Sequence, residues 1–237
     1  MIPLLHDFTN APVLVFGGGP VGARKSRRFA READVTVVSP EFVDESFGSS
    51  DEEGDDETAN LSDAETVGSV ELVRAAPEPE AVEEWIKRVD PALVVAATDD
   101  EAVNEAAVEA ARDRGVLVNR ADRSGERAPG SVVVPATVRD DQVVVSISTG
   151  GTAPVLSKYL RQELEGTLEG ASEMATVLGE LRTELKDREV PADRRRTIVS
   201  NVVNSSSTWT ALRTGTSNYG QVIEDVLDEE YATEGEP

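Results

Sequence analysis

Cysteine is absent from this 237-residue sequence, and histidine occurs once, at His6. The lack of cysteine excludes disulfides, thiolate catalysis and thiolate metal sites. One histidine is too few for a histidine-rich metal site, so we expect no metal ligands. No apolar run approaches the ~18 residues that a membrane-spanning helix needs. The first residues, "MIPLLHDF", lack the basic region and cleavable apolar stretch of a signal peptide. We therefore expect a soluble cytoplasmic protein.

Basic residues are scarce: 23 Lys and Arg stand against 46 Asp and Glu, a formal net charge of −23. Nucleic acids and anionic membranes need a basic surface, so we expect neither as a partner. An excess of surface carboxylates is typical of halophile-like proteins, in which salt screens the self-repulsion. The alternative is that much of the charge lies in one loop. Residues 44–66 are acidic, rich in Ser and Gly and poor in apolar side chains, and we expect them to form a mobile loop.

The most informative local motif is a glycine cluster between a predicted strand and a predicted helix. Val13–Phe16 is an uninterrupted apolar run, as a buried parallel strand requires, and Gly17, Gly19 and Gly22 then match G-x-G-x-x-G. In such a loop the first glycine allows a tight turn, the second lets the backbone approach a pyrophosphate, and the third lets the helix pack closely. The helix N-terminus offers N–H groups to the phosphates. The motif predicts a cofactor-binding turn made by Gly17, Gly19, Pro20, Val21 and Gly22, with a purely structural turn as the alternative.

Apolar strands alternate with helical patterns along residues 12–122. The predicted strands cover about 13–16, 34–40, 69–75, 92–100 and 116–122, and the predicted helices cover about 20–32, 78–89 and 101–115. This alternation predicts an α/β fold, with an N-terminal Rossmann domain built on a doubly wound parallel sheet.

The pattern changes after residue 122. Two short strand candidates, Ser131–Val134 and Gln142–Ser148, flank an Arg-Asp-Asp turn and predict a hairpin, and helical patterns continue from Pro154. We divide the chain into an NAD-binding domain (1–122), a small β-hairpin and helix module (123–166) and a helical C-terminal domain (167–237). A two-stranded hairpin is barely stable alone, so we expect the middle module to pair two chains into a homodimer. Packing of the module on its own sheet is the alternative.

Three stretches together resemble the precorrin-2 dehydrogenase family, which is the dehydrogenase and ferrochelatase part of sirohaem synthases. They are "VLVFGGGPVGARK", "VVAATDDEAVN…VNRAD" and "SISTGGTAPVLSKYLRQELE", and the likeness runs from residue 1 to about 213. The resemblance implies an oxidoreductase that converts precorrin-2 to sirohydrochlorin with NAD⁺, in sirohaem (tetrapyrrole) biosynthesis, as a homodimer. Some members also insert Fe²⁺, and the sequence leaves open whether this chain does.

The resemblance makes Asp122 the candidate catalytic residue. It is the aspartate of the "N-x-x-D" stretch, at the end of a predicted strand, where open α/β sheets bind their ligands. In the resembling family this aspartate is implicated in dehydrogenation and in chelation, and both reactions remove protons from a tetrapyrrole. A carboxylate serves as the base if partial burial raises its pKa. A turn-capping aspartate is the alternative.

Further cofactor contacts are expected at the ends of other strands. Ser39, Pro40 and Glu41 follow the second strand, where the adenine ribose of a dinucleotide lies, and Thr98 and Asp99 follow the fourth. NAD enzymes usually carry an acid at the end of the second strand, and Glu41 comes slightly later than that. We favour NAD because no arginine follows to hold a 2′-phosphate and Glu41 would repel one. A helix N-cap is the alternative role for Thr98 and Asp99.

The loop "STGGTAP" (148–154) is the second informative loop. Its glycines permit close approach of a ligand, Thr152 could cap the next helix, and Pro154 suits the first helical position. Precorrin-2 carries eight carboxylates, so anion-holding loops and basic side chains are what this substrate demands. The expected substrate-binding residues are Arg120, Thr149, Gly150, Gly151, Thr152 and Lys158, with Arg123, Arg127 and Arg161 nearby in the sequence. Ordinary solvated surface is the alternative for the basic residues.

Two other functions are compatible with the glycine motif. An NAD-binding regulatory or sensor module without catalysis usually keeps the acid after the second strand, which is absent here. A reductase for another small carbonyl compound would need a Lys, Tyr or His proton donor near the nicotinamide, and no good candidate stands out.

Overall fold

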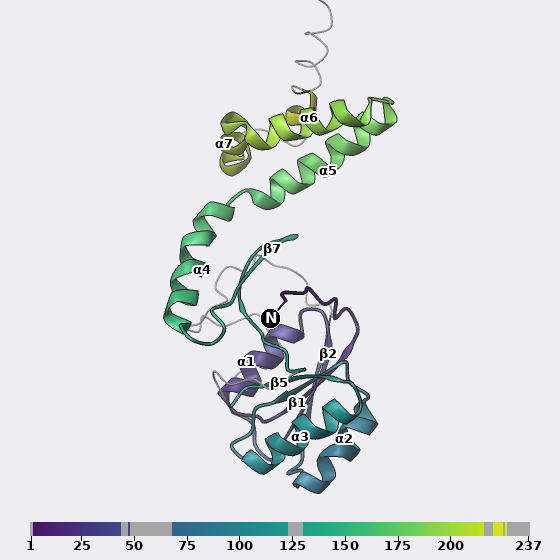
Figure 1. The fold of residues 1–237 in the computed structure, drawn as a ribbon, viewed down its shortest axis with the longest axis vertical. Helices are drawn as coiled ribbons and strands as arrows, with labels where there is room; N and C mark the ends of the chain where they lie inside the picture. The colour runs from purple at the N-terminus through teal and green to yellow at the C-terminus, as the bar shows by residue number, and fades with distance from the viewer. Residues whose placement is uncertain are drawn as a thin grey trace, which may run out of the picture. The chain divides into compact units, whose positions relative to one another are not determined.

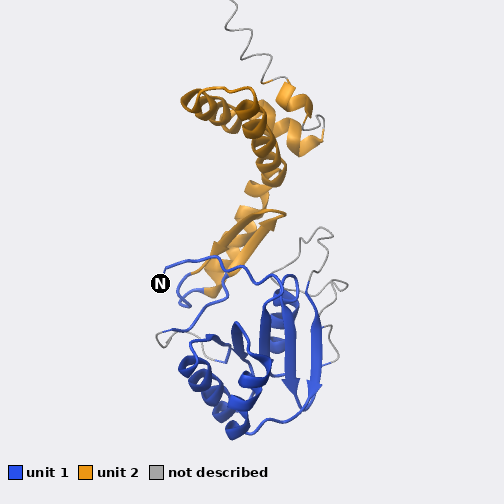
Figure 2. Ribbon diagram, turned by 90° about the vertical axis from the view of Figure 1, so that its right-hand side faces the viewer, with its two compact units in different colours: residues 1–59, 63–135, 149–153 blue, residues 60–62, 136–148, 154–237 orange. Residues whose placement is uncertain are grey.

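A computed structural model describes residues 2–43, 47, 68–122, 130–215, 220–224 and 226. The expected acidic loop of residues 44–66 lies outside the described residues except for Phe47, and so do Arg123 and Arg127. The described chain forms two compact units, coloured separately in Figure 2. The first unit holds the described residues up to Pro135 together with Thr149–Ala153. The second holds Ala136–Ser148 and the described residues from Pro154 onward. The division of the chain at residues 122 and 166 stays a prediction.

The first unit is built on a five-stranded parallel sheet with the order β3-β2-β1-β4-β5 (Figure 1). The strands are β1 (Pro12–Phe16), β2 (Asp34–Ser39), β3 (Val70–Arg74), β4 (Leu93–Ala96) and β5 (Leu117–Arg120). Phe16 at the end of β1 lies opposite Val38 of β2 and Ala96 of β4, and every neighbouring pair is parallel. The predicted doubly wound α/β fold is confirmed.

Helices cover both faces of this sheet because both faces of the central strand are apolar. The helices are α1 (Pro20–Phe29), α2 (Val82–Val89), which follows the short helix η1 (Pro79–Ala81), and α3 (Glu101–Asp113). Leu14 and Phe16 pack into a core with side chains of α2 and α3, whereas Val13 and Val15 pack into a core with side chains of α1. Figure 1 shows α1 on one side of the sheet and α2 and α3 on the other. All four side chains are fully buried. The alternation of strand residues thus places one helical layer on each side, as buried parallel sheets require.

The second unit begins with an antiparallel hairpin, and its first strand differs from the predicted one. The strands are β6 (Ala136–Asp140) and β7 (Val143–Ile147), joined by a turn in which Asp141 has a φ of +46°. Ser131–Val134 was expected to be the first strand, and this prediction is wrong. Ser131 instead makes a parallel bridge to Val118 of β5, and the Val132 N–H donates to the Val118 carbonyl at 2.8 Å. A tight hairpin pairs the residues next to its turn, and those are the residues after Pro135, not before it.

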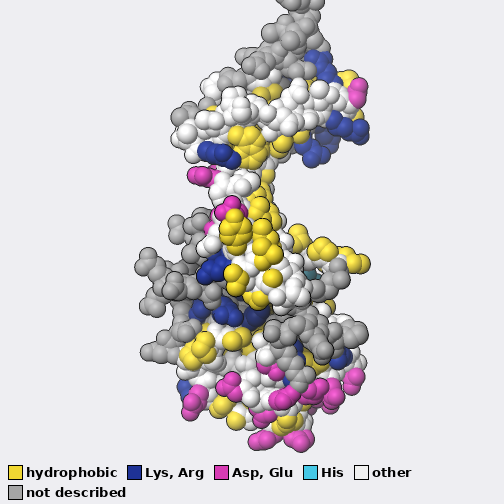
Figure 3. All heavy atoms as spheres, turned by 60° about the vertical axis from the view of Figure 1, so that its left-hand side comes forward, with side chains coloured by type: hydrophobic (Ala, Val, Ile, Leu, Met, Phe, Trp, Pro, Cys, Tyr) yellow, Lys and Arg dark blue, Asp and Glu magenta, His cyan; other side chains and the backbone are white. Residues whose placement is uncertain are grey.

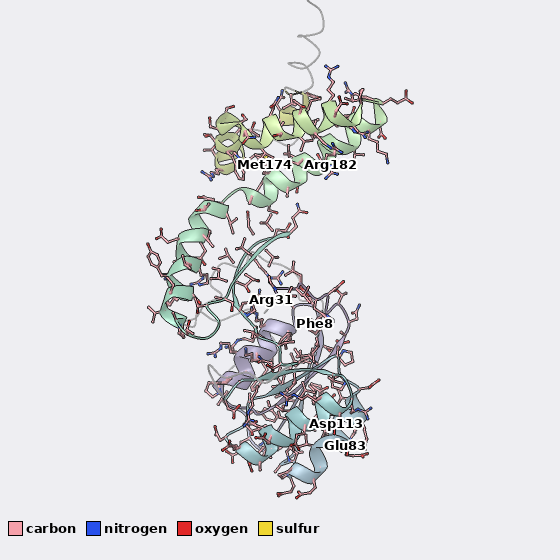
Figure 4. The ribbon with its side chains drawn as sticks, in the orientation of Figure 1. Phe8, Arg31, Glu83, Asp113, Met174 and Arg182 are labelled. Atoms are coloured by element: carbon pink, nitrogen blue, oxygen red, sulfur yellow. The ribbon has the colours of Figure 1, made fainter. Side chains whose placement is uncertain are left out.

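Four helices follow the hairpin, α4 (Pro154–Leu168), α5 (Ala171–Asp187), α6 (Ala192–Asn204) and α7 (Ser206–Thr214), and residues 220–224 are helical as well. Helix α7 was not predicted as a separate element. Apolar side chains of α5, α6 and α7, among them Met174 of α5, form one buried cluster (Figure 4). The hairpin is tied to α5, since the Ser172 N–H donates to Asp140 at 2.9 Å and the Gln142 amide donates to Thr176 at 3.0 Å.

Helix α4 exposes a row of large apolar side chains. Val155 is 83% exposed and Tyr159 is 55% exposed, and Leu156 and Leu160 lie beside them on the same side of the helix. Hydrophobic side chains are visible at the surface of this unit in Figure 3. Adjacent exposed apolar side chains of this kind are typical of surfaces that contact another molecule. Within the described part of the chain, none of the helices has the length and apolar character needed to cross a membrane.

Candidate functional site

The glycine turn after β1 is sterically constrained at two positions and open at a third. Gly17 has a φ of +116°, and a Cβ there would lie 2.3 Å from the carbonyl oxygen of Ala97. A Cβ at Gly22 would lie 1.9 Å from the carbonyl oxygen of Gly17. At Gly19, a Cβ would meet no described atom within 4 Å. The first and third glycines are therefore required by the packing of the turn, whereas the second borders open space.

The N-terminus of α1 adjoins that open space. Gly19 is the N-cap residue and makes no side-chain capping bond, Pro20 is the first helical residue, and the first turn of α1 contains no acidic side chain. The positive end of the helix dipole and its backbone N–H groups are thus not neutralised by a carboxylate of the first turn. A cradle of this kind fits a pyrophosphate, which needs both close backbone approach and N–H donors.

The segment after β2 lies against the glycine turn. Ser39 is 7% exposed, and its Oγ lies 2.8 Å from the position that a Cβ on Gly18 would take. The Val43 N–H donates to the Gly18 carbonyl at 2.9 Å. The exposed residues Pro40 and Glu41 lie between these two contacts. The structure therefore brings the predicted residues Ser39, Pro40 and Glu41 next to the predicted turn.

An arginine lies beside this segment, and the sequence analysis missed it. Arg74 ends β3 and pairs in register with Ser39, so the sheet places it at the end of β2. Its Nη1 donates to the Pro40 carbonyl at 3.2 Å, and its guanidinium lies 5.7 Å from the centre of the Phe42 ring. No arginine follows β2 directly in the sequence, as stated above, but strand pairing brings Arg74 to the end of β2. Only strand pairing reveals Arg74, because it is far from β2 in the sequence.

The loop after β4 is held by a residue that the sequence analysis did not select. The Thr98 N–H donates to Oδ1 of Asn104 at 3.1 Å, and the Asn104 amide donates to the Thr98 carbonyl at 2.8 Å. Asn104 is 1% exposed. The N-cap of α3 is Asp100, whose carboxylate accepts from the N–H groups of Ala102 and Val103 at 2.8 and 3.3 Å. The alternative that Thr98 or Asp99 caps this helix is therefore wrong.

Asp122 lies two residues beyond the end of β5, where Arg120 binds it through two atoms. Nε of Arg120 donates to Oδ1 of Asp122 at 2.8 Å, and Nη2 donates to Oδ2 at 3.1 Å. Nη1 of Arg120 donates to Glu105 of α3 at 3.1 Å, and Oε1 of Glu101, also on α3, lies 3.8 Å from Nη2 of Arg120. The side chain of Arg120 is 13% exposed and that of Asp122 is 23% exposed. Arg120 was expected to bind substrate. In the structure its guanidinium lies beside three carboxylates of its own chain, those of Asp122, Glu105 and Glu101.

Arg120 lowers the pKa of Asp122. Partial burial acts to raise the pKa of Asp122, but the hydrogen bonds and positive charge of Arg120 outweigh it, so that pKa lies below its usual value. The pKa of Arg120 is raised, chiefly by its hydrogen bond to Asp122. A raised pKa was expected for the base, and the structure does not provide it. Asp122 instead remains ionised throughout the neutral range.

The other predicted substrate residues lie in two places. Thr149, Gly150, Gly151 and Thr152 form a turn in which the Thr152 hydroxyl donates to the Thr149 carbonyl at 2.6 Å, and this turn groups with the first unit. Both glycines have positive φ, +69° and +86°. Pro154 begins α4 as predicted. In the second unit, Lys158 is exposed on α4, whereas Arg161 is buried and paired with Glu165.

The acidity of the chain is not spread evenly over the first unit. Acidic side chains gather over the α2–α3 layer, at the bottom of Figure 3, and Figure 4 labels Glu83 and Asp113 there. Helix α1 carries the basic residues Arg24, Lys25, Arg27 and Arg28 and no acidic residue. Among the described residues, no group of three or more His, Cys, Asp or Glu side chains is arranged to hold a metal ion.

Comparisons with known proteins agree with this arrangement. A family model described as putative NAD(P)-binding matches residues 4–136. A precorrin-2 dehydrogenase from Methanosarcina barkeri is 31% identical over 210 residues, which are 88% of this chain and 85% of that protein. Siroheme synthase 1 from Aeromonas salmonicida is 30% identical over 239 residues, which are 99% of this chain and 46% of that protein. The chain thus spans less than half of that longer relative.

A solved structure has the same fold. The structure of SirC, a precorrin-2 dehydrogenase, aligns with a TM-score of 0.62 and 24% identity, covering 95% of this chain and 100% of that chain. The alignment extends over both units of the chain.

The cap of α3 gives a direct test of the loop after β4. Asp100→Ala removes the acceptor for two backbone N–H groups, so the free energy of unfolding should fall by about 1 kcal/mol. Asp99→Ala is the matched control, and its effect should stay within ~0.5 kcal/mol because Asp99 is exposed and does not cap the helix. Urea denaturation measures both. Equal losses in the two variants would show that Asp100 is not the cap.

Proposed function

The chain belongs to the precorrin-2 dehydrogenase family, and from that premise we propose that it oxidises precorrin-2 to sirohydrochlorin with NAD⁺. One observation carries the proposal. The parallel sheet places the open cradle at Gly19 and the ionised carboxylate of Asp122 at the same edge, where its strands end. Hydride transfer coupled to proton removal needs these two features together. The relative from Methanosarcina barkeri, a precorrin-2 dehydrogenase, supports the choice of substrate.

The reaction removes one hydride and one proton from precorrin-2 and yields sirohydrochlorin, NADH and H⁺. The nicotinamide of NAD⁺, when bound, accepts the hydride. A ring that has lost a hydride is cationic and its N–H is acidic, so a carboxylate of low pKa is a sufficient proton acceptor. Asp122 takes that proton on a carboxylate oxygen. Its side chain is 23% exposed, which gives the proton a route to solvent.

We assign the coenzyme to the glycine turn and the neighbouring strand ends. Gly17, Gly19, Pro20, Val21 and Gly22 would hold the pyrophosphate at the N-terminus of α1. Ser39, Pro40 and Glu41 would bind the adenine ribose, and Thr98 and Asp99 would border the nucleotide from the end of β4. Glu41 would repel a 2′-phosphate, and Arg74 is already bonded to the Pro40 carbonyl, so NAD rather than NADP remains our choice. The cytoplasm, which supplies NAD⁺, remains the expected compartment.

The turn of Thr149, Gly150, Gly151 and Thr152 remains a proposed contact for the substrate carboxylates, and Lys158, which belongs to the second unit, remains a separate one. Insertion of Fe²⁺ into sirohydrochlorin is a second candidate activity, favoured by the similarity to siroheme synthase 1 over 99% of this chain. Asp122 would accept the pyrrole protons in that reaction. Formation of sirohaem from sirohydrochlorin and Fe²⁺, followed by its absorbance, tests this activity separately.

The exposed apolar row of α4 supports a homodimer. Light scattering should give twice the chain mass of 25.3 kDa at micromolar concentration. Tyr159→Asp places a charge in the row and should shift the protein toward the monomer, because a charge cannot be buried there without a partner. Thr183→Asp, on an exposed position of α5, is the control and should leave the mass unchanged. A monomeric wild-type protein would contradict the proposed dimer.

Substitutions in the glycine turn separate coenzyme binding from folding. Gly19 has an extended backbone, and a Cβ there meets no described atom, so Gly19→Ala should leave the melting temperature unchanged. The methyl group would stand where the pyrophosphate approaches, so NAD⁺ should bind about tenfold more weakly. Gly22→Ala should destabilise the protein by about 1–3 kcal/mol, because its Cβ would lie 1.9 Å from a backbone oxygen. Calorimetry measures both properties. Unchanged NAD⁺ affinity in Gly19→Ala would remove the cradle from the proposal.

Asp122→Asn is the decisive test of the proposed reaction. The substitution keeps the shape of the side chain and removes its basicity, so turnover should fall by roughly 10²–10⁴-fold. NAD⁺ affinity should hold, because the glycine turn carries that binding. Absorbance of NADH at 340 nm with precorrin-2 and NAD⁺ measures the rate. Asp113→Asn, on exposed α3 surface, is the control for a lost negative charge. A wild-type protein that makes no NADH from precorrin-2 at any salt concentration would refute the function.

A further inference from the structure

Arg120 binds Asp122 in a fork that fixes both oxygens of one carboxylate. Nε reaches Oδ1 at 2.8 Å and Oδ2 at 3.2 Å, and Nη2 reaches Oδ2 at 3.1 Å, so bonds from two nitrogens to both oxygens hold the plane of the carboxylate. A single hydrogen bond would leave that plane free to rotate about the bond. The two residues are separated by one position, Ala121, whose N–H is bonded to the end of β4 at 2.8 Å. The chain that connects the pair is therefore itself anchored to the sheet.

Helix α3 holds the guanidinium from its other side. Nη1 of Arg120 donates to Glu105 at 3.1 Å, and Glu101 lies 3.8 Å from Nη2. These acids are one helical turn apart on α3, so they face Arg120 from a rigid element. The side chain of Arg120 is only 13% exposed. Arg120 thus links a stable helix to a carboxylate that follows a strand end.

We propose that Arg120 is a positioning residue for Asp122, which it orients for proton transfer through the two-bond fork, with Glu105 and Glu101 holding Arg120 in turn. The inference rests on the proposed function, in which Asp122 accepts the proton. A carboxylate that is fixed in plane presents its remaining lone pairs in a constant direction, and misplacement of a reacting group by about 1 Å can lower a rate ~10²-fold. This role replaces the direct substrate contact that the sequence analysis expected for Arg120.

The pH dependence follows from the groups around the pair. Glu101 and Glu105 of α3 face Arg120, Asn104 of α3 contributes a hydrogen bond to Asp122, and Arg120 is the one described charged group that lowers the pKa of Asp122. Without Arg120, the two largest causes that lower the pKa of Asp122 are lost, while burial, which acts to raise it, remains. Asp122 acts when ionised, so activity is lost as the pH falls through its pKa. Removal of Arg120 should therefore move the acidic limb of the rate profile to higher pH.

Three variants separate geometry from charge. Arg120→Gln removes both the fork and the positive charge, so kcat should fall about 10²-fold. The acidic limb of its pH–rate profile should lie at higher pH, and the KM for precorrin-2 should change little. Arg120→Lys keeps the charge and lacks the fork, so its acidic limb should stay near that of the wild type while kcat remains low. Glu105→Gln weakens the hold of α3 on the Arg120 guanidinium but leaves Arg120 bound to Asp122. It should therefore lower kcat less than Arg120→Gln does.

Arg188→Gln is the matched control. Nε of Arg188 binds Glu184 at 2.7 Å on α5, so this substitution also removes an arginine from a carboxylate, in the second unit. Its kcat and pH profile should equal those of the wild type. NAD⁺ affinity, measured in every variant, reports whether the first unit is folded. If Arg120→Gln does not bind NAD⁺, the inference is tested by the kcat and pH profile of Arg120→Lys and Glu105→Gln instead.

Direct titration makes the inference independent of turnover. The carboxyl carbon of Asp122, followed by NMR against pH, should titrate at lower pH in the wild type than in Arg120→Gln. Equal titration of Asp122 in both proteins would overturn the inference, and so would a wild-type kcat in Arg120→Gln. A raised KM with unchanged kcat would also overturn it and assign Arg120 to substrate binding. If the wild type makes no NADH while the titration shifts as expected, the proposed function fails and the coupling of Arg120 to Asp122 stands.

Discussion

The parallel pairing of β1 with β2 on one side and β4 on the other is the constraint on which the candidate site depends. Phe16 lies opposite Val38 and Ala96, so the chain leaves these three strands at one edge. The register is specified by burial on both faces, because a slip of one residue would exchange the side chains that pack on α1 with those that pack on α2 and α3. The glycine turn and the loops after β2 and β4 are close together for this reason alone.

The glycine turn shows how packing and binding share one motif. Gly17 and Gly22 are needed where backbone meets backbone, at the Ala97 carbonyl and at the Gly17 carbonyl respectively. Gly19 has no such neighbour among the described residues. Two glycines of the motif thus stabilise the turn, and the remaining one leaves room for a ligand at the positive end of α1.

Local electrostatics at Asp122 run against the overall charge of the chain. A net charge of −23 would act to raise the pKa of any carboxyl group, but a single arginine at hydrogen-bond distance prevails over distant acids that solvent and salt screen. The same arginine is surrounded by three carboxylates, so the cluster as a whole remains negative. This arrangement keeps Asp122 ionised and oriented, which suits a proton acceptor for an acidic N–H better than a neutral carboxyl group would.

Local sequence patterns were sufficient to predict several parts of this protein. Apolar runs and helical spacing predicted the five strands and three helices of the first unit, because burial on a sheet demands that periodicity. G-x-G-x-x-G predicted the turn, and "N-x-x-D" pointed to Asp122. Tertiary structure alone decided the contacts between residues that are distant in the chain. Strand pairing brought Arg74 to Pro40, helix α3 brought Glu105 to Arg120, and the edge of β5 took Ser131 away from the hairpin. The low pKa of Asp122 belongs to this second group, because it depends on the direction of a guanidinium that the fold holds between a helix and a strand end.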